Sequence, residues 1–141
     1  MATFQKVKLE DVVDYIVDNR GKNPPAFYES GIPVIDNSQI TGNRSVSLES
    51  SKRFIDEMAF QNFIRKYIQK DDLLITLVGN GYGNVALAPK EKSVIIQNTI
   101  GIRCNNLCLN NYLFYYLSFN KNKVTDLDRG VAQPSVKVGY L

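Results

Sequence analysis

The sequence contains no histidine among its 141 residues, and this absence narrows the chemistry that it can perform. Histidine is the commonest general base and the usual partner of a nucleophilic serine or cysteine. Magnesium-dependent nuclease chemistry needs several convergent carboxylates, often with a lysine two residues beyond one of them. No Asp-x-Lys or Glu-x-Lys sequence occurs in the chain. We therefore expect a protein that is not an enzyme and that carries no cofactor.

Two further absences concern location and metal binding. No apolar stretch approaches the roughly 20 residues of a membrane span, and residues 1–6 lack the pattern of a signal peptide. We therefore expect a cytoplasmic protein with no membrane partner. The two cysteines, Cys104 and Cys108, cannot by themselves supply the four ligands of a structural zinc site, so we expect structural thiols.

The net charge is also small. The formal net charge is only +3, far below the strongly positive net charge of a protein that holds nucleic acid by charge alone. The composition therefore permits a DNA partner without arguing for one. A length of 141 residues fits one domain with a single core.

The most apolar part of the chain, residues 71–103, predicts three consecutive strands. Residues 73–78 form a near-continuous run of branched side chains, which is typical of a strand buried on both faces. The glycines and asparagines of residues 79–84 favour a loop and a chain reversal into the second strand. The third strand is expected to run from 93–96 through Gln97 and Asn98 into 99–103. We expect these two amides to tie strands together through buried hydrogen bonds.

The rest of the pattern predicts short helices and one more strand around this sheet. Helical spacing of apolar residues predicts a helix over 8–17, and residues 31–35 read as a strand. Asp56 is expected to cap a helix that closes at Arg65 and Lys66. A last helix over 109–117 would have Asn110 as its cap and tyrosines mostly in the core. The predicted fold is α+β: one compact domain over residues 1–141, with a mostly antiparallel, twisted sheet, short flanking helices and long polar loops.

Three polar loops carry the candidate DNA contacts. Cations near residues 18–25 can hold phosphates, although a solvated turn would look the same. Residues 36–53 offer amides that can pair with adenine and arginines that can pair with guanine, although polar loops are also simply polar. The one bulky group in the 79–84 loop can stack on a base or rest on a strand. The candidates are Arg20, Lys22 and Asn23 in the first loop, Asn37, Gln39, Asn43, Arg44, Lys52 and Arg53 in the second, and Asn80 and Tyr82 in the third.

Two other motifs favour a structural interpretation. The glycines at 79, 81 and 83 suggest a phosphate-binding loop, but such a loop opens a helix, whereas residues 85–87 read as a strand. Hairpin geometry explains these glycines better. Asp71 and Asp72 precede a core strand, where acidic turn residues are ordinary, so we expect no metal or catalytic role for them.

Several segments, taken in order, resemble the target-recognition domain of type I restriction-modification specificity subunits. Each segment is short, but their order makes the resemblance fairly specific, and it covers nearly all 141 residues. The segments are Lys8–Val12, Asn19–Pro25, Gly31–Ile35, Asp72–Thr76 with the glycine loop that follows it, Gln97–Gly101 and Gly130–Val136.

The resemblance implies a non-catalytic domain that reads one half of a bipartite site in double-stranded DNA. It would direct methyltransferase and endonuclease subunits, and S-adenosylmethionine and the nuclease activity would belong to those partners. A full specificity subunit looks like two such domains separated by long helices. This chain has no long heptad-bearing segment, so we expect it to be truncated before the long spacer helix, and homodimerisation is unsettled.

The alternative is a protein-interaction or structural module without a DNA function. The two hypotheses differ in where they place the polar side chains of the three loops. DNA reading requires these side chains to converge on one face of the fold, whereas scattered placement would favour the alternative.

Overall fold

The computed structural model of this protein describes residues 9–21 and 23–119. Its main sheet has four strands in the order β1-β6-β4-β5, and all neighbouring strands are antiparallel. A smaller antiparallel sheet pairs β2 with β3. This architecture confirms the predicted α+β class and its mostly antiparallel sheet. The strands are β1 Val13–Val17, β2 Ile32–Val34, β3 Arg53–Ile55, β4 Leu73–Thr76, β5 Val85–Leu87 and β6 Thr99–Cys104.

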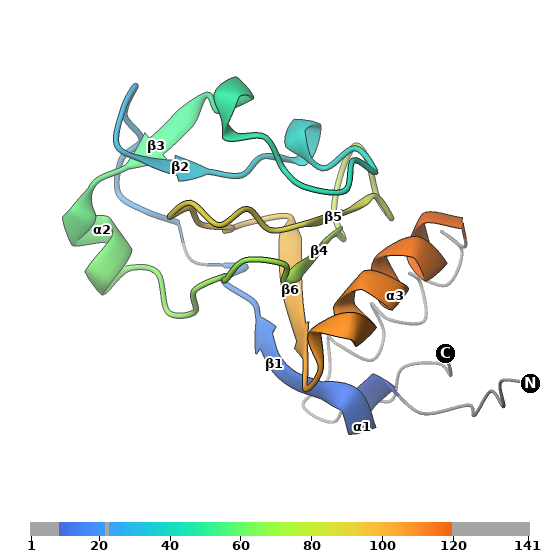
Figure 1. Ribbon diagram of the computed structural model, residues 1–141. Helices are drawn as coiled ribbons and strands as arrows, with labels where there is room; N and C mark the ends of the chain where they lie inside the picture. The colour runs from blue at the N-terminus through green and yellow to red at the C-terminus, as the bar shows by residue number, and fades with distance from the viewer. Residues whose placement is uncertain (1–8, 22, 120–141) are drawn as a thin grey trace, which may run out of the picture.

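The helices lie around these two sheets. The α-helix α3 packs beside the main sheet, whereas β2, β3 and α2 lie on the other side of it (Figure 1). Two turns of 3₁₀ helix, η1 and η2, lie between β2 and β3 in the sequence. The helices are α1 Leu9–Val12, η1 Asn37–Gln39, η2 Leu48–Ser50, α2 Glu57–Asn62 and α3 Leu107–Phe119.

Strand β4 is an inner strand of the main sheet, and its apolar side chains pack on both faces of the sheet. All four of its residues are buried. Leu73 and Ile75 pack in one cluster with Leu113, Phe114 and Leu117 of α3. Leu74 belongs to a second cluster, which contains Val17, Ile35, Ile40, Val46 and Ile95. The predicted burial on both faces is therefore confirmed for residues 73–76, whereas the strand ends before Val78, which is 50% exposed.

The predicted helix over residues 8–17 is wrong for residues 13–17. Helix α1 ends at Val12, and residues 13–17 form β1. Ile16 lies opposite Ile102 in the pairing of β1 with β6. Residues 13–17 are rich in β-branched and aromatic side chains, which fit a half-buried pleated surface, so pairing with β6 outweighs the helical spacing.

Two other element boundaries also differ from prediction. The capping role of Asp56 is confirmed, because its Oδ1 accepts a hydrogen bond from the Ala59 backbone N–H at 2.8 Å. Helix α2 ends at Asn62, however, so Arg65 and Lys66 lie beyond it. Residues 93–96 form no strand of the main sheet. Val94 instead makes a single parallel bridge with Val34, which connects this segment to the small sheet.

Helix α3 begins at Leu107, so Asn110 lies within the helix and is not its cap. The Asn110 side chain is fully buried, and its Oδ1 accepts from the Cys104 backbone N–H at 2.9 Å. Its Nδ2 donates to the Asp71 carbonyl oxygen at 2.7 Å. The predicted burial of the tyrosines is wrong for Tyr112 and Tyr115, which are 48% and 50% exposed. Asn110, which was predicted to cap the helix, instead links the end of β6 to Asp71 through its buried side-chain amide.

The 79–84 segment connects β4 to β5 as a hairpin loop, as predicted. Gly79, Gly81 and Gly83 have φ values of 83°, 83° and 87°, a region that favours glycine because it has no Cβ. The Thr76 backbone N–H donates to the Asn84 carbonyl oxygen at 3.0 Å across the base of the loop. A strand follows the loop, so the structure excludes the dinucleotide-binding geometry.

Candidate nucleic-acid interface

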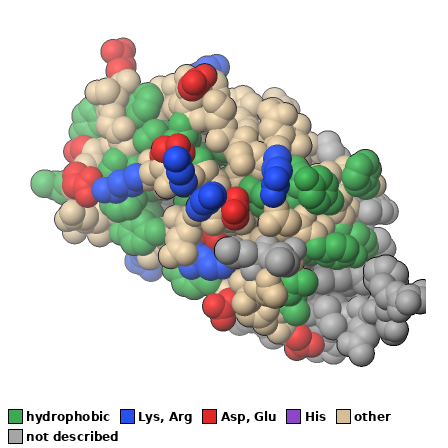
Figure 2. All heavy atoms as spheres, in the orientation of Figure 1, with side chains coloured by type: hydrophobic (Ala, Val, Ile, Leu, Met, Phe, Trp, Pro, Cys, Tyr) green, Lys and Arg blue, Asp and Glu red, His purple; other side chains and the backbone are tan. Residues whose placement is uncertain are grey.

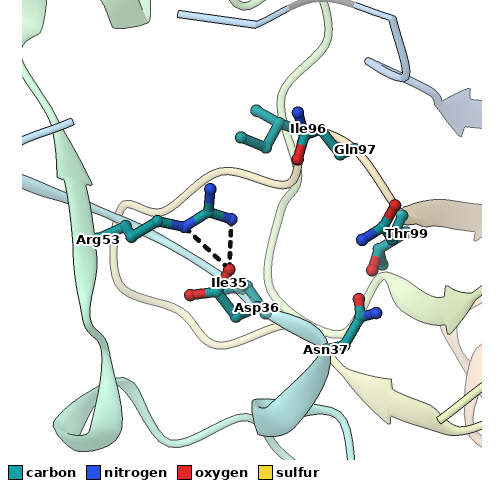
Figure 3. Close-up of a pocket in the computed structure, with 8 residues that line it drawn as sticks. Ile35, Asp36, Asn37, Arg53, Ile96, Gln97 and Thr99 are labelled. Carbon is teal, nitrogen blue, oxygen red and sulfur yellow. Dashed lines mark hydrogen bonds and ion pairs between the residues drawn. The ribbon is translucent and has the colours of Figure 1, made fainter. Parts of the chain in front are cut away.

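A hollow of about 210 Å³ lies where the predicted polar loops meet (Figure 3). Its walls come from the end of β2 and η1, from β3, and from the segment that enters β6. Two isoleucines supply apolar surface, and the other six side chains can make hydrogen bonds. The lining residues are Ile35, Asp36, Asn37, Arg53, Ile96, Gln97, Asn98 and Thr99.

Hydrogen bonds connect the other two polar loops to this hollow. Asn23, from the first loop, accepts a hydrogen bond through its Oδ1 from Gln97 Nε2. Asn37 Nδ2 donates to the carbonyl oxygens of Val78 and Asn80, at 3.1 and 3.3 Å, and so joins η1 to the glycine loop. Hydrogen bonds therefore link the three loops, but of the eleven candidate residues only Asn37 and Arg53 line the hollow.

Arg53 extends from β3 to the side of the hollow. Its Nε and Nη2 both donate to Oδ1 of Asp36, with Nε at 3.1 Å, and Figure 3 shows the guanidinium above that carboxylate. The Arg53 Cζ also lies 4.5 Å from the centroid of the Phe27 ring. The Arg53 and Asp36 side chains are 35% and 24% exposed, so the pair is accessible from solvent.

Arg20 is also held by a carboxylate. Its Nε and Nη2 donate to the two oxygens of Asp18, at 3.0 and 2.8 Å. Burial would raise the pKa of Asp18, but hydrogen bonds and charge from Arg20 outweigh this effect and lower the pKa. Both candidates from this loop with described positions, Arg20 and Asn23, therefore have defined partners. Lys22 lies outside the described residues.

Gln39 differs from the other candidates because its side chain is used inside the protein. It is only 7% exposed. Its Oε1 accepts from the Asp36 backbone N–H at 2.8 Å, and its Nε2 donates to the Ser47 carbonyl oxygen at 3.2 Å. These contacts hold the 36–51 loop together and give Gln39 a structural role.

The remaining candidates lie on the surface. Arg44 is exposed and donates from Nη2 to Asn111 Oδ1 of α3 at 2.7 Å. Asn43, Lys52 and Asn80 are exposed, and Tyr82 is 40% exposed. None of these five lines the hollow.

Sequence reasoning missed part of this site. Gln97 and Asn98 were interpreted as buried ties between strands, but Gln97 is exposed and both residues line the hollow. Their position as two amides within an apolar segment was the available signal. Asp36 and Phe27 were not among the predicted site residues, because their contacts with Arg53 form only when β2 pairs with β3.

The surface charge is mixed. On the face that Figure 2 draws, the lysine and arginine side chains of the described residues are interspersed with acidic ones. This pattern agrees with the small net charge of +3.

Within residues 9–21 and 23–119, no group of three or more His, Cys, Asp or Glu side chains is arranged to hold a metal ion. None of the helices in the same ranges has the length and apolar character needed to traverse a bilayer.

The described residues have an α+β fold in which hydrogen bonds link three polar loops. The sequence matches the family described as the type I restriction modification DNA specificity domain over residues 1–141, and the chain belongs to this family. The family is a non-catalytic DNA-recognition component of type I restriction-modification systems. The resemblance inferred from the sequence segments is thereby confirmed.

Two solved structures have a similar fold. The HsdS subunit from Thermoanaerobacter tengcongensis gives a TM-score of 0.69 at 14% identity, over 96% of this chain and 32% of that one. A chain from a structure on complex assembly and conformational transition of the type I R-M system gives 0.67 at 14% identity, over 97% and 33%. This chain thus spans about a third of each solved chain. No curated protein gives a significant sequence match.

Proposed function

We propose that residues 1–141 act as one target-recognition domain that reads one half of a bipartite site in double-stranded DNA. The observation that carries this proposal is the meeting of three polar loops around the hollow beside Arg53. Arginine and amide side chains supply the donors and acceptors that read base edges in the major groove. The hydrogen bonds that link the three loops, together with the family match, support this proposal over a protein-interaction module without a DNA function.

Most of the candidate residues keep their proposed roles. The proposed phosphate contacts are Arg20 and Lys22, and Asn23 is a proposed DNA contact beside them. The proposed base-reading set is Asn37, Asn43, Arg44, Lys52, Arg53, Asn80 and Tyr82. Gln39 leaves the set, because its buried side chain already makes three hydrogen bonds within the protein. Gln97 and Asn98 join it, because they line the hollow.

The test is co-expression with the methyltransferase subunit of the same system, followed by mapping of modified adenines. Replacement of Asn43, Arg44 and Arg53 by alanine is expected to abolish the site preference. A matched control replaces Gln61, Arg65 and Lys90, which are exposed, lie outside the three loops and remove the same charge. The control is expected to leave the modified sequence unchanged.

The outcomes separate the hypotheses. An unchanged site preference in the loop variant would remove these three residues from the reading surface. Absence of any modified adenine with the wild-type chain, while the methyltransferase remains active with another specificity subunit, would contradict the proposed function as a whole.

We further propose that the working partners are a methyltransferase subunit and an endonuclease subunit, and that they act on DNA in the cytoplasm. One domain reads only half of a bipartite site, so the second half requires either another domain or a second copy of this chain. Light scattering of the complex with the methyltransferase subunit distinguishes a homodimer from an assembly with one specificity chain.

A further inference from the structure

Arg53 is the only cation among the eight residues that line the hollow, and its guanidinium is fixed before any ligand binds. Asp36 Oδ1 accepts from both Nε and Nη2, which occupies one edge of the guanidinium. The Phe27 ring lies against it, 4.5 Å from Cζ. Because Asp36 and the Phe27 ring already hold the Arg53 side chain, it loses little further conformational entropy when a ligand binds.

The carboxylate that holds Arg53 is itself anchored. The Asp36 backbone N–H donates to Gln39 Oε1 at 2.8 Å, and the Asp36 carbonyl oxygen accepts from the Gln39 backbone N–H at 2.9 Å. Val34, two residues before Asp36, pairs directly with Arg53 in the small sheet. Strand pairing and a buried glutamine therefore set the position of the guanidinium.

The contacts with Asp36 leave a second edge of the guanidinium available. A guanidinium carries five N–H donors, of which Asp36 takes two, and the other three lie on Nη1 and Nη2. Nη1 donates none of the hydrogen bonds found within residues 9–21 and 23–119. In Figure 3 the third nitrogen points away from Asp36, toward the side of the hollow that carries Ile96 and Gln97. Two parallel N–H groups on this end edge fit a pair of acceptors.

We propose that Arg53 reads a guanine in the recognised half-site, and that Asp36 and Phe27 are positioning residues for it. This inference rests on the proposed DNA-reading function. The O6 and N7 atoms of guanine are the two major-groove acceptors that an arginine end edge matches. A phosphate is the poorer ligand here, because the Asp36 carboxylate offsets the charge of Arg53 and repels a second anion.

The first arm of the test uses the wild-type complex with the methyltransferase subunit and a duplex that carries the mapped site. Each guanine is replaced in turn by 7-deazaguanine, which lacks the N7 acceptor. One guanine in the half-site is expected to show binding weakened by about tenfold, since a good bidentate pair contributes about 1–3 kcal/mol of discrimination. Because this arm needs no protein variant, the absence of any sensitive guanine overturns the inference.

The second arm assigns that guanine to Arg53. Arg53→Gln is expected to bind the natural duplex about tenfold more weakly and to lose its sensitivity to 7-deazaguanine at that position alone. Its salt dependence is expected to stay the same, whereas loss of a phosphate contact would reduce the slope of log affinity against log salt by about one. A reduced slope with retained sensitivity assigns Arg53 to a phosphate and overturns the inference.

The third arm tests the positioning residues. Asp36→Asn is expected to reduce discrimination at the same guanine while Arg53 remains charged, and Asp36→Glu is expected to restore part of it. The matched control is Glu57→Gln, which removes a carboxylate that holds Lys92, away from the hollow. Equal weakening on every duplex by Asp36→Asn would indicate a purely structural role and overturn the positioning assignment.

These outcomes are separable from failure of the proposed function. A wild-type chain that directs no modification at all contradicts DNA reading itself. A chain that directs modification at a defined site, but whose Arg53→Gln variant retains every base preference, contradicts only the guanine assignment.

Discussion

Two arginine–aspartate pairs in this domain use the same groups in different surroundings. Arg103 donates to both oxygens of Asp72 at 2.8 Å, and its Cζ lies 4.7 Å from the Tyr15 ring. Arg53 donates twice to a single oxygen of Asp36, and its Cζ lies 4.5 Å from the Phe27 ring. The Asp72 side chain is 1% exposed and that of Asp36 is 24% exposed.

The difference lies in how completely each pair is used within the protein. Asp72 also accepts from the Gln69 backbone N–H at 2.9 Å, and the hydrogen bond with Asp72 raises the pKa of Arg103. This pair joins β6 to the start of β4, and we call it part of the frame, by which we mean the contacts that hold the main sheet together. Nη2 of Arg103 also donates to the Tyr67 carbonyl oxygen at 3.3 Å, whereas among the described residues Nη2 of Arg53 donates only to Asp36. The Arg53 pair is also the more exposed one, which supports its proposed role in binding.

Breaking the buried pair is expected to produce the largest effect. Arg103→Met leaves the Asp72 carboxylate buried without its counter-ion, and the expected loss of unfolding free energy is about 3–5 kcal/mol. Denaturant unfolding followed by circular dichroism measures it. The double variant Arg103→Met with Asp72→Asn removes the stranded charge and is expected to recover part of the loss. A loss below about 1 kcal/mol in the single variant would contradict the assignment of this pair to the frame.

The alkylation rate of the Cys104 thiol reports how often the region around the Arg103–Asp72 pair unfolds locally. Cys104 follows Arg103 in β6, and burial raises the pKa of its thiol from 9.0 to about 11. Because the thiolate is the reactive form, alkylation at pH 8 is expected to be about 100-fold slower than in denatured protein and to accelerate as the pH approaches 11. Mass spectrometry measures the rate in a Cys108→Ser background. Equal rates in native and denatured protein would show that the region opens readily.

Breaking the exposed pair is expected to change stability much less. Arg53→Met removes a partly exposed ion pair, so the expected loss of unfolding free energy is about 1 kcal/mol or less. The same denaturant experiment as for Arg103→Met gives the comparison directly. If the two variants lose similar amounts, the distinction between a frame pair and a binding pair fails.

A third cation, Lys92, is expected to have the smallest effect. It lies 2.8 Å from Glu57 Oε1 and 4.1 Å from the centroid of the Phe60 ring, and both charged side chains are about half exposed. Lys92→Gln is expected to leave the thermal midpoint and DNA binding unchanged, because solvent screens an exposed pair. A changed site preference in this variant would extend the reading surface to α2.

Features that depend on residues close together in the sequence were predicted correctly, whereas features that depend on distant residues were not. The apolar run of β4 and the Asp56 cap were predictable, because burial on both faces and helix capping leave local patterns. Residues 13–17 were not, because their spacing suits a helix and only pairing with distant β6 makes them a strand. The same limit applies to the site, where Gln97 meets Asn23 and Arg53 meets Asp36 only after folding.

The tie between η1 and the glycine loop has a practical consequence. Asn37 donates to the main-chain oxygens of Val78 and Asn80, which every amino acid provides. The side chains at positions 80 and 82 are therefore interchangeable as far as this tie is concerned. A library randomised at these two positions would keep the loop anchored while it offers new groups to the ligand. Backbone atoms thus anchor the glycine loop, while the side chains at positions 80 and 82 are left to contact a ligand.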